Sequence, residues 1–239
     1  MGCIYKLALI KKTQYMEEKQ RQYDSFAQTS SIQHQEMLCG PKPSVSRGNE
    51  LYYIENYSKN TILDIGCGTG HRTFPEYINK NIKYFGIEKF ENLINASRFK
   101  SNIIQGDICS SNFILLLEDE NLINEIGVSF NLTVLLGGVV NSFISDEYRD
   151  IAWKNISLLL NRSKYVLFDT LTHFSWYELE SKGKTIELPI PVEIPPQYFY
   201  SKLELENIFT ENRIEIIEAK SEFLPGGLKR CHFLISQEK

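Results

Sequence analysis

Three closely spaced glycines preceded by an acid are the residues of this chain best suited to hold a ligand. They lie in Asp64-Ile65-Gly66-Cys67-Gly68-Thr69-Gly70, directly after an apolar run. Glycine permits positive φ and lets a ligand approach the main chain closely. Where such a turn leads into a helix, the free N–H groups of the first helical turn form a polar binding edge. The run therefore predicts a ligand-binding corner between a strand and a helix.

Two further acids follow the next strand-like runs. Glu88 ends the run Tyr84-Phe85-Gly86-Ile87-Glu88, and Asp107 follows the next run in Gln105-Gly106-Asp107-Ile108. A carboxylate at the first position can accept hydrogen bonds from both hydroxyls of a ribose. The alternative interpretations are a solvated glutamate at a strand end and a turn aspartate after glycine.

The surrounding sequence alternates between two kinds of segment. Strand-like and helix-like runs succeed one another, which predicts βαβ units, right-handed connections and a parallel sheet. Two further strand candidates, about 213–218 and 230–236, flank the turn Pro225-Gly226-Gly227 and predict a C-terminal hairpin. The strand-like runs are 61–65, 83–88, 101–105, 130–136 and 164–169, and the helix-like runs are 72–79, 90–98, 114–125 and 147–160.

Two segments stand outside this alternation. We predict that residues 1–60 form an N-terminal helical cap and that residues 61–239 form the ligand-binding core. Within the core, an insert at 170–200 is rich in aromatic residues and proline. Its alternating run from Ile186 to Ile194 carries prolines on one face, which predicts an edge strand or a ribbon. We expect the insert to contribute to an acceptor pocket.

The pattern D-x-G-x-G-x-G at 64–70 resembles the first motif of the class I, S-adenosylmethionine (SAM) dependent methyltransferases of small-molecule type. It differs from the dinucleotide fingerprint G-x-G-x-x-G, which has its third glycine one position later. The resemblance implies an α/β fold with a doubly wound, mostly parallel, seven-stranded sheet. It implies SAM as the cofactor and S-adenosylhomocysteine (SAH) as the product. The cofactor-binding residues that it implies are Tyr23, Arg47, Asp64, Gly66, Cys67, Gly68, Glu88, Asp107, Ile108, Leu136 and Gly137.

The resemblance also gives these residues roles. Asp107 would bind the adenine amino group, and the Ile108 backbone would bind a ring nitrogen. Leu136 and Gly137 would line the cofactor where the acceptor meets the sulfonium. Arg47 would hold the methionine carboxylate through two hydrogen bonds, and Tyr23 would belong to a helical lid.

Methyl transfer from SAM is an in-line displacement, so the main task of the protein is to align the reacting atoms. A general base is needed only for a protonated acceptor. His173, just after the fifth strand-like run, is the candidate catalytic base, and a packing role is the alternative. We predict a methyltransferase that acts on an N, O or C nucleophile of a small molecule. A nicotinamide-dependent oxidoreductase and a non-catalytic SAM-binding regulatory subunit are the alternatives.

Composition limits the other function classes. The chain has 239 residues, a net charge of −4 and a pI of about 5.7, which disfavours a nucleic-acid partner. No apolar run is long enough to span a membrane.

The five cysteines form no C-x-x-C pair, which predicts reduced thiols, a cytoplasmic location and no metal site. Cys67 fits the turn as a small residue rather than as a nucleophile. The sequence does not indicate the oligomeric state.

Overall fold

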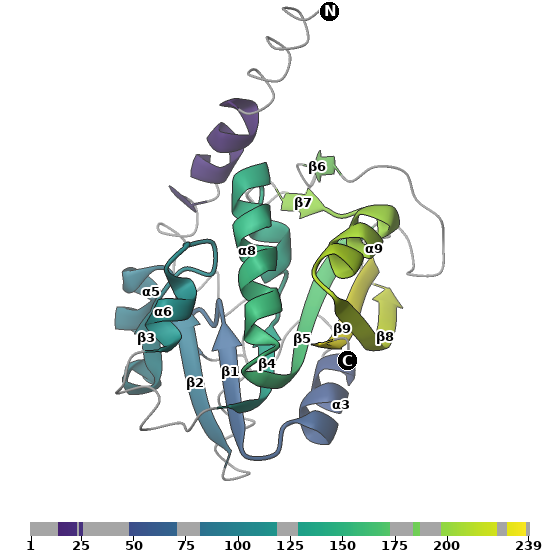
Figure 1. The fold of residues 1–239 in the computed structure, drawn as a ribbon. Helices are drawn as coiled ribbons and strands as arrows, with labels where there is room; N and C mark the ends of the chain where they lie inside the picture. Colours follow the sequence, from purple (N-terminus) through teal and green to yellow (C-terminus); the bar gives the residue numbers. More distant parts are fainter. Residues whose placement is uncertain are drawn as a thin grey trace, which may run out of the picture.

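A seven-stranded sheet with the order β3-β2-β1-β4-β5-β9-β8 forms the centre of the fold (Figure 1). The computed structural model describes residues 14–22, 24–25, 48–70, 82–118, 129–172, 184–186, 197–223 and 229–237. The strands of the sheet are β1 (Thr61–Ile65), β2 (Lys83–Glu88), β3 (Ile103–Gln105), β4 (Phe130–Leu135), β5 (Ser163–Thr172), β8 (Ile214–Phe223) and β9 (Lys229–Gln237).

Six of the seven strands run in the same direction, and only β9 runs opposite to them. Strands β3, β2, β1, β4 and β5 run parallel, whereas β9 is antiparallel to both β5 and β8. This confirms the predicted mostly parallel sheet with a C-terminal hairpin. The usual dinucleotide-binding order is 3-2-1-4-5-6. Here the final strand of the chain instead inserts between β5 and the strand before it.

Helices cover both faces of the sheet, as a doubly wound fold requires. The helices are α3 (Gly48–Tyr57), α5 (Glu91–Ala96), α6 (Phe113–Leu117), α8 (Asp146–Leu159) and α9 (Lys202–Glu211), with short 3-10 turns η1 (Lys100–Asn102) and η2 (Val139–Ser142). Among the described residues, no helix is long and apolar enough to cross a membrane.

Alternate residues of the strands supply two separate cores. Phe168 of β5 packs with Trp153 of α8 and Phe209 of α9 on one face. Its chain neighbour Leu167 packs with Tyr53 of α3 on the other face. Successive side chains of a strand point to opposite faces, so central strands covered on both sides become continuous apolar runs. This explains why the central strands could be predicted from the sequence.

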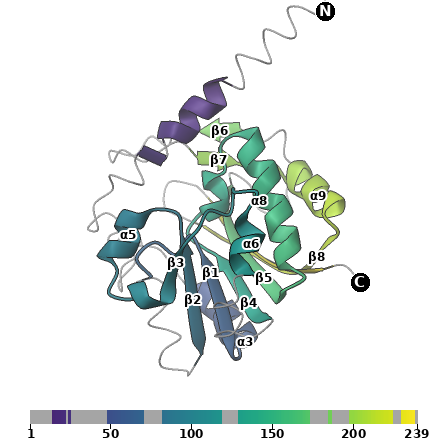
Figure 2. The ribbon, with the colours of Figure 1, turned by 60° about the vertical axis from the view of Figure 1, so that its left-hand side comes forward.

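The carboxyl ends of the parallel strands lie beneath two additional segments. A helix at residues 14–22 and the strand pair of β6 (Lys184–Ile186) and β7 (Gln197–Phe199) lie beyond the arrowheads of these strands (Figures 1 and 2). The 139–145 segment touches both, since Ile144 N–H donates to Gln20 Oε1 over 2.9 Å and Asn141 Nδ2 donates to the Tyr198 carbonyl over 2.7 Å. The carboxyl edge of the sheet is therefore covered.

Several element boundaries differ from the prediction. Strand β3 begins at Ile103 rather than at 101, because residues 100–102 form η1. Strands β5 and β8 extend past their predicted ends to Thr172 and Phe223, where each pairs with β9. The predicted helix at 72–79 and most of the predicted edge strand after Ile186 lie outside the described residues.

Candidate active site

The glycine turn after β1 adopts the backbone conformation that its sequence predicts. Gly66, Gly68 and Gly70 have φ of 68°, 59° and 74°, in the left-handed region that favours glycine. The turn is held to β2, because Gly66 N–H donates to the Ile87 carbonyl over 2.8 Å. A Cβ at Gly66 would lie 2.7 Å from Val139 Cγ2. The first glycine is thus required both by its φ and by the close approach of the segment after β4.

Glu88 meets this turn directly. Its Oε2 accepts from Gly68 N–H over 2.8 Å, and its Oε1 accepts from Phe90 N–H over 3.0 Å. Burial raises the pKa of this carboxyl, and donation from Phe90 and Gly68 opposes the rise. Each carboxylate oxygen retains a lone pair after one hydrogen bond. The arrangement fits the ribose of a nucleoside cofactor.

A second polar group lies behind the turn. Tyr84 Oη donates to Asp64 Oδ2 over 2.8 Å, and both side chains are buried. Burial, followed by the charges of Asp64 and Glu88, raises the pKa of the Cys67 thiol well above its usual range. A protonated thiol is a poor nucleophile. The environment thus agrees with the prediction that Cys67 is not a nucleophile.

The loop after β3 is fixed from two sides. Asp107 Oδ1 accepts from Cys109 N–H over 2.8 Å, and its Oδ2 lies 3.2 Å from Lys89 Nζ. Asn155 of α8 donates to the Ile108 carbonyl over 2.7 Å and to the Ser110 carbonyl over 2.9 Å. The segment expected to face adenine therefore has a fixed backbone path.

The segment after β4 forms the opposite wall. Leu136 is buried, and Gly137 and Gly138 have φ of 84° and 77°. Gly138 N–H donates to Asp169 Oδ1 over 2.7 Å, which ties this segment to β5. Asn141, which is fully buried, accepts from Leu171 N–H over 2.9 Å.

The helix at 14–22 is docked on this edge by one face. Met16 is buried in the core, and Gln20 accepts from Ile144 N–H. Asp24, which is also helical, lies 3.0 Å from Lys89 Nζ. Burial lowers the pKa of Lys89, but the charges of Asp107 and Asp24 outweigh burial and raise the pKa overall. Lys89 therefore connects the N-terminal segment to the loop after β3.

The structure brings most of the predicted site residues to one sheet edge. Gly66, Cys67 and Gly68 lie against Glu88, with Asp64 behind them, and the Asp107 and Leu136 loops follow neighbouring strands. The predicted site residues Tyr23, Arg47 and His173 lie outside the described residues. Sequence reasoning missed Gln20, Asn155 and Asp169, whose partners are far away along the chain. Their types offered no signal, because Gln, Asn and Asp are common on any surface.

Comparisons with known proteins agree with this geometry. Residues 4–119 match the family model of protein-L-isoaspartate(D-aspartate) O-methyltransferase (PCMT). No curated protein matches the chain. A SAM-dependent methyltransferase from Clostridium acetobutylicum ATCC 824 has a TM-score of 0.58 at 13% identity, over 91% of this chain and 99% of that chain.

Two other solved structures show how widely this fold is used. The glycopeptide N-methyltransferase MtfA complexed with SAM has a TM-score of 0.54 at 11% identity, over 83% of this chain and 89% of that chain. The cyclase SpnF has a TM-score of 0.53 at 10% identity, over 80% of each chain. At such identities the likeness establishes the fold, and the reaction must be argued from the site. The sheet order, the glycine turn and these likenesses show that the chain has the α/β, Rossmann-like fold of the class I SAM-dependent methyltransferases.

Proposed function

We propose that the protein transfers the methyl group of SAM to an N, O or C nucleophile of a small-molecule acceptor. The observation that carries this proposal is the contact of 2.8 Å between Gly68 N–H and Glu88 Oε2. It joins the positive-φ turn to a carboxylate positioned for ribose hydroxyls. SAM supplies a methyl group on a positively charged sulfur, which is already a good leaving group.

The residues of the chain would bind and orient the reactants. Glu88 would accept from the ribose hydroxyls, and the loop Asp107–Ile108 would face adenine. The glycines at 137 and 138 would let the main chain approach the reacting centre closely. Alignment of this kind accounts for a large part of the rate of a displacement reaction. His173 remains the predicted base for an acceptor that arrives protonated.

The cover over the sheet edge supports a small acceptor. The helix at 14–22 and the β6–β7 pair both contact the 139–145 segment, so the edge is overlaid from two directions. A closed cover excludes water and favours a ligand that fits inside it. The matched family is named for a protein acceptor, but its match ends at residue 119, before β4, β5 and the insert.

The described cysteines support a cytoplasmic location. Cys67, Cys109 and Cys231 are free thiols, as expected in a reducing compartment. Burial and the charge of Asp107 also raise the pKa of the Cys109 thiol, which limits its reactivity.

Incubation with methyl-labelled SAM and fractionated cell extract tests the proposal. One extract fraction would contain only small molecules, and the other would contain macromolecules. We expect label to enter the small-molecule fraction with wild-type protein and not with Gly66→Val, because a side chain at Gly66 would collide with Val139. Label in the protein fraction alone would contradict the small-molecule acceptor, and label in neither would contradict methyl transfer.

A further inference from the structure

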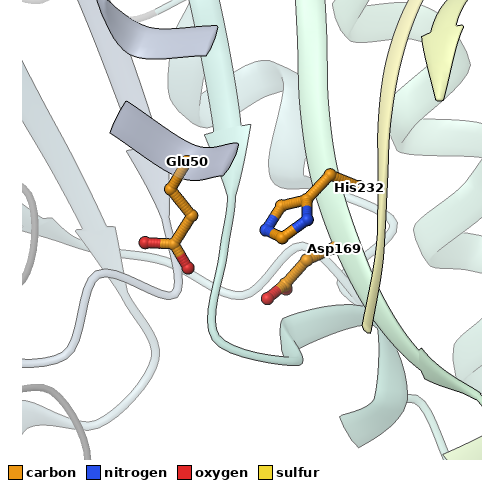
Figure 3. A group of neighbouring side chains, drawn as sticks. All are labelled: Glu50, Asp169 and His232. Atoms are coloured by element: carbon orange, nitrogen blue, oxygen red, sulfur yellow. The ribbon is translucent and has the colours of Figure 1, made fainter. Parts of the chain in front are cut away.

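Three buried ionisable side chains converge between α3 and the C-terminal hairpin. Glu50 comes from α3, Asp169 from β5 and His232 from β9, and the three point toward one another (Figure 3). One side-chain nitrogen or oxygen atom from each lies within 4.8 Å of those from the others. The exposed fraction of each residue is 0%. We call Glu50, Asp169 and His232 the buried triad.

The sheet register places two of these residues side by side. Asp169 is the cross-strand partner of His232 in the antiparallel pair β5–β9. Directly opposed residues in such a pair project from the same face. Leu167 and Leu234, two positions away, pack with α3 residues in the second core. The triad therefore belongs to the α3 face at the carboxyl edge of the sheet.

The described charges around the triad come from three acids and one arginine. Arg230 Nε lies 3.2 Å from Asp169 Oδ2, and Arg230 Nη1 lies 3.5 Å from Glu50 Oε1 and 3.8 Å from Glu222 Oε1. Among the described residues, one guanidinium thus faces three carboxylates. A nearby positive charge favours the ionised form of a carboxyl group.

His232 provides a second and independent observation. Neither of its ring nitrogens has a hydrogen-bond partner among the described residues, although both atoms are buried. A neutral imidazole carries one N–H donor and one lone pair. Buried polar atoms in folded proteins nearly always have a partner, and an ion can serve as one.

We propose that Glu50, Asp169 and His232 bind one divalent transition-metal ion. Two carboxylates and an imidazole form a mixed oxygen and nitrogen ligand set that suits ions such as Mn²⁺ or Zn²⁺. Bonds of about 2.1 Å would hold the ligand atoms roughly 3 to 4 Å apart, so small side-chain rotations suffice. An ion of charge +2 would balance Glu50 and Asp169 and leave Arg230 to balance Glu222. Complete burial of the triad favours a single ion over an organic ligand.

The ion would lie beside the candidate active site without being part of the cofactor site. The second oxygen of Asp169 accepts from Gly138 N–H over 2.7 Å, next to Val139, which approaches Gly66. Metal-bound carboxylates are commonly fixed by such hydrogen bonds. Metal binding would therefore hold the segment after β4 in place, and it can be measured without SAM or an acceptor.

Metal titration of the full-length protein, stripped of metal by a chelator, tests the inference. We expect calorimetry to give one Mn²⁺ site per chain. We expect pulsed electron paramagnetic resonance to detect coupling from one imidazole nitrogen to the bound Mn²⁺. His232→Gln should abolish the nitrogen coupling and weaken Mn²⁺ binding by at least about tenfold. Glu218→Gln is the matched control, because Glu218 lies on β8 and interacts with Tyr57 and Lys220 outside the triad.

A thermal-unfolding measurement keeps the test independent of the variants. Metal that binds the native state raises the unfolding temperature of wild-type protein, and the rise grows with the logarithm of the metal concentration divided by its Kd. An unchanged unfolding temperature and no saturable binding of Mn²⁺ or Zn²⁺ by the wild type would overturn the inference. Binding and nitrogen coupling that persist in His232→Gln would also overturn it. Failure of methyl transfer would leave the metal-binding result unaffected.

Discussion

Gly68 N–H donates to Glu88 Oε2 over 2.8 Å, so the turn after β1 and the acid that ends β2 form one unit. The same carboxylate accepts from Phe90 N–H over 3.0 Å, which fixes its orientation before any ligand arrives. A carboxylate held in this way is ready to accept further hydrogen bonds from a ribose.

Replacing Glu88 by glutamine should weaken SAH binding. A hydrogen bond to a charged group contributes about 1.5 to 3 kcal/mol, so we expect a loss of about tenfold or more. Isothermal titration calorimetry measures the change. Glu91→Gln is the control, because Glu91 is an exposed residue in the first turn of α5. Equal affinities of the Glu88 variant and the wild type would remove Glu88 from the site.

The affinity for SAH should fall in acidic solution. Burial raises the pKa of Glu88 from its usual 4.5, and ribose hydroxyls would bind its ionised form. Protonation of the carboxyl, as the pH falls through this raised pKa, therefore opposes binding. Calorimetry from neutral to mildly acidic pH should show that SAH binding begins to weaken above pH 4.5. The Glu88→Gln variant should lack this transition, and a pH-independent wild type would contradict the account.

Loss of the Lys89 charge should loosen the N-terminal helix. Lys89 Nζ lies 3.0 Å from Asp24 Oδ2 and 3.2 Å from Asp107 Oδ2. These groups are partly exposed, so the connection contributes at most about 1 kcal/mol, or fivefold in an opening equilibrium. We expect Lys89→Met to speed amide hydrogen exchange of residues 14–22 by up to about this factor. Arg21→Ala, at an exposed ion pair on the same helix, should leave it unchanged.

Asn155 should act as a positioning residue for the loop after β3, which we propose to face adenine. Its buried amide donates to the carbonyls of Ile108 and Ser110. Asn155→Ala would leave these carbonyls without their donor and lower the free energy of unfolding by about 1 to 3 kcal/mol. Denaturant unfolding should detect this loss of stability, and SAH titration should detect weaker SAH binding. Lys154→Ala, at the exposed neighbouring position, should affect neither.

The sequence allowed prediction of the parts of the fold that depend on local patterns. The bounds of β1 and β2 agree with their apolar runs. The mostly parallel, seven-stranded sheet followed from a resemblance. The position of β9 between β5 and β8 was not predicted, because local pattern does not determine strand order.

Long-range contacts could not be predicted in this way. Gln20 meets Ile144, and Asp169 meets Gly138 and His232, only after the sheet has formed. Their partners are decided by strand register and helix docking, which spacing along the chain does not reveal. The C-terminal part of β8, residues 219–223, was not predicted because it contains polar residues. Lys220 contacts Tyr52 of α3, and Glu222 lies near Arg230, so neither side chain belongs to an apolar core.

Calorimetric titration of the purified protein with SAH, with NADH as the control ligand, tests the central claim most directly. The account predicts micromolar binding of SAH at one site per chain and no binding of NADH. This result would agree with the glycine turn, the Glu88 contact and the antiparallel position of β9. Binding of NADH, or no binding of SAH, would contradict the assignment of this sheet edge as a SAM site.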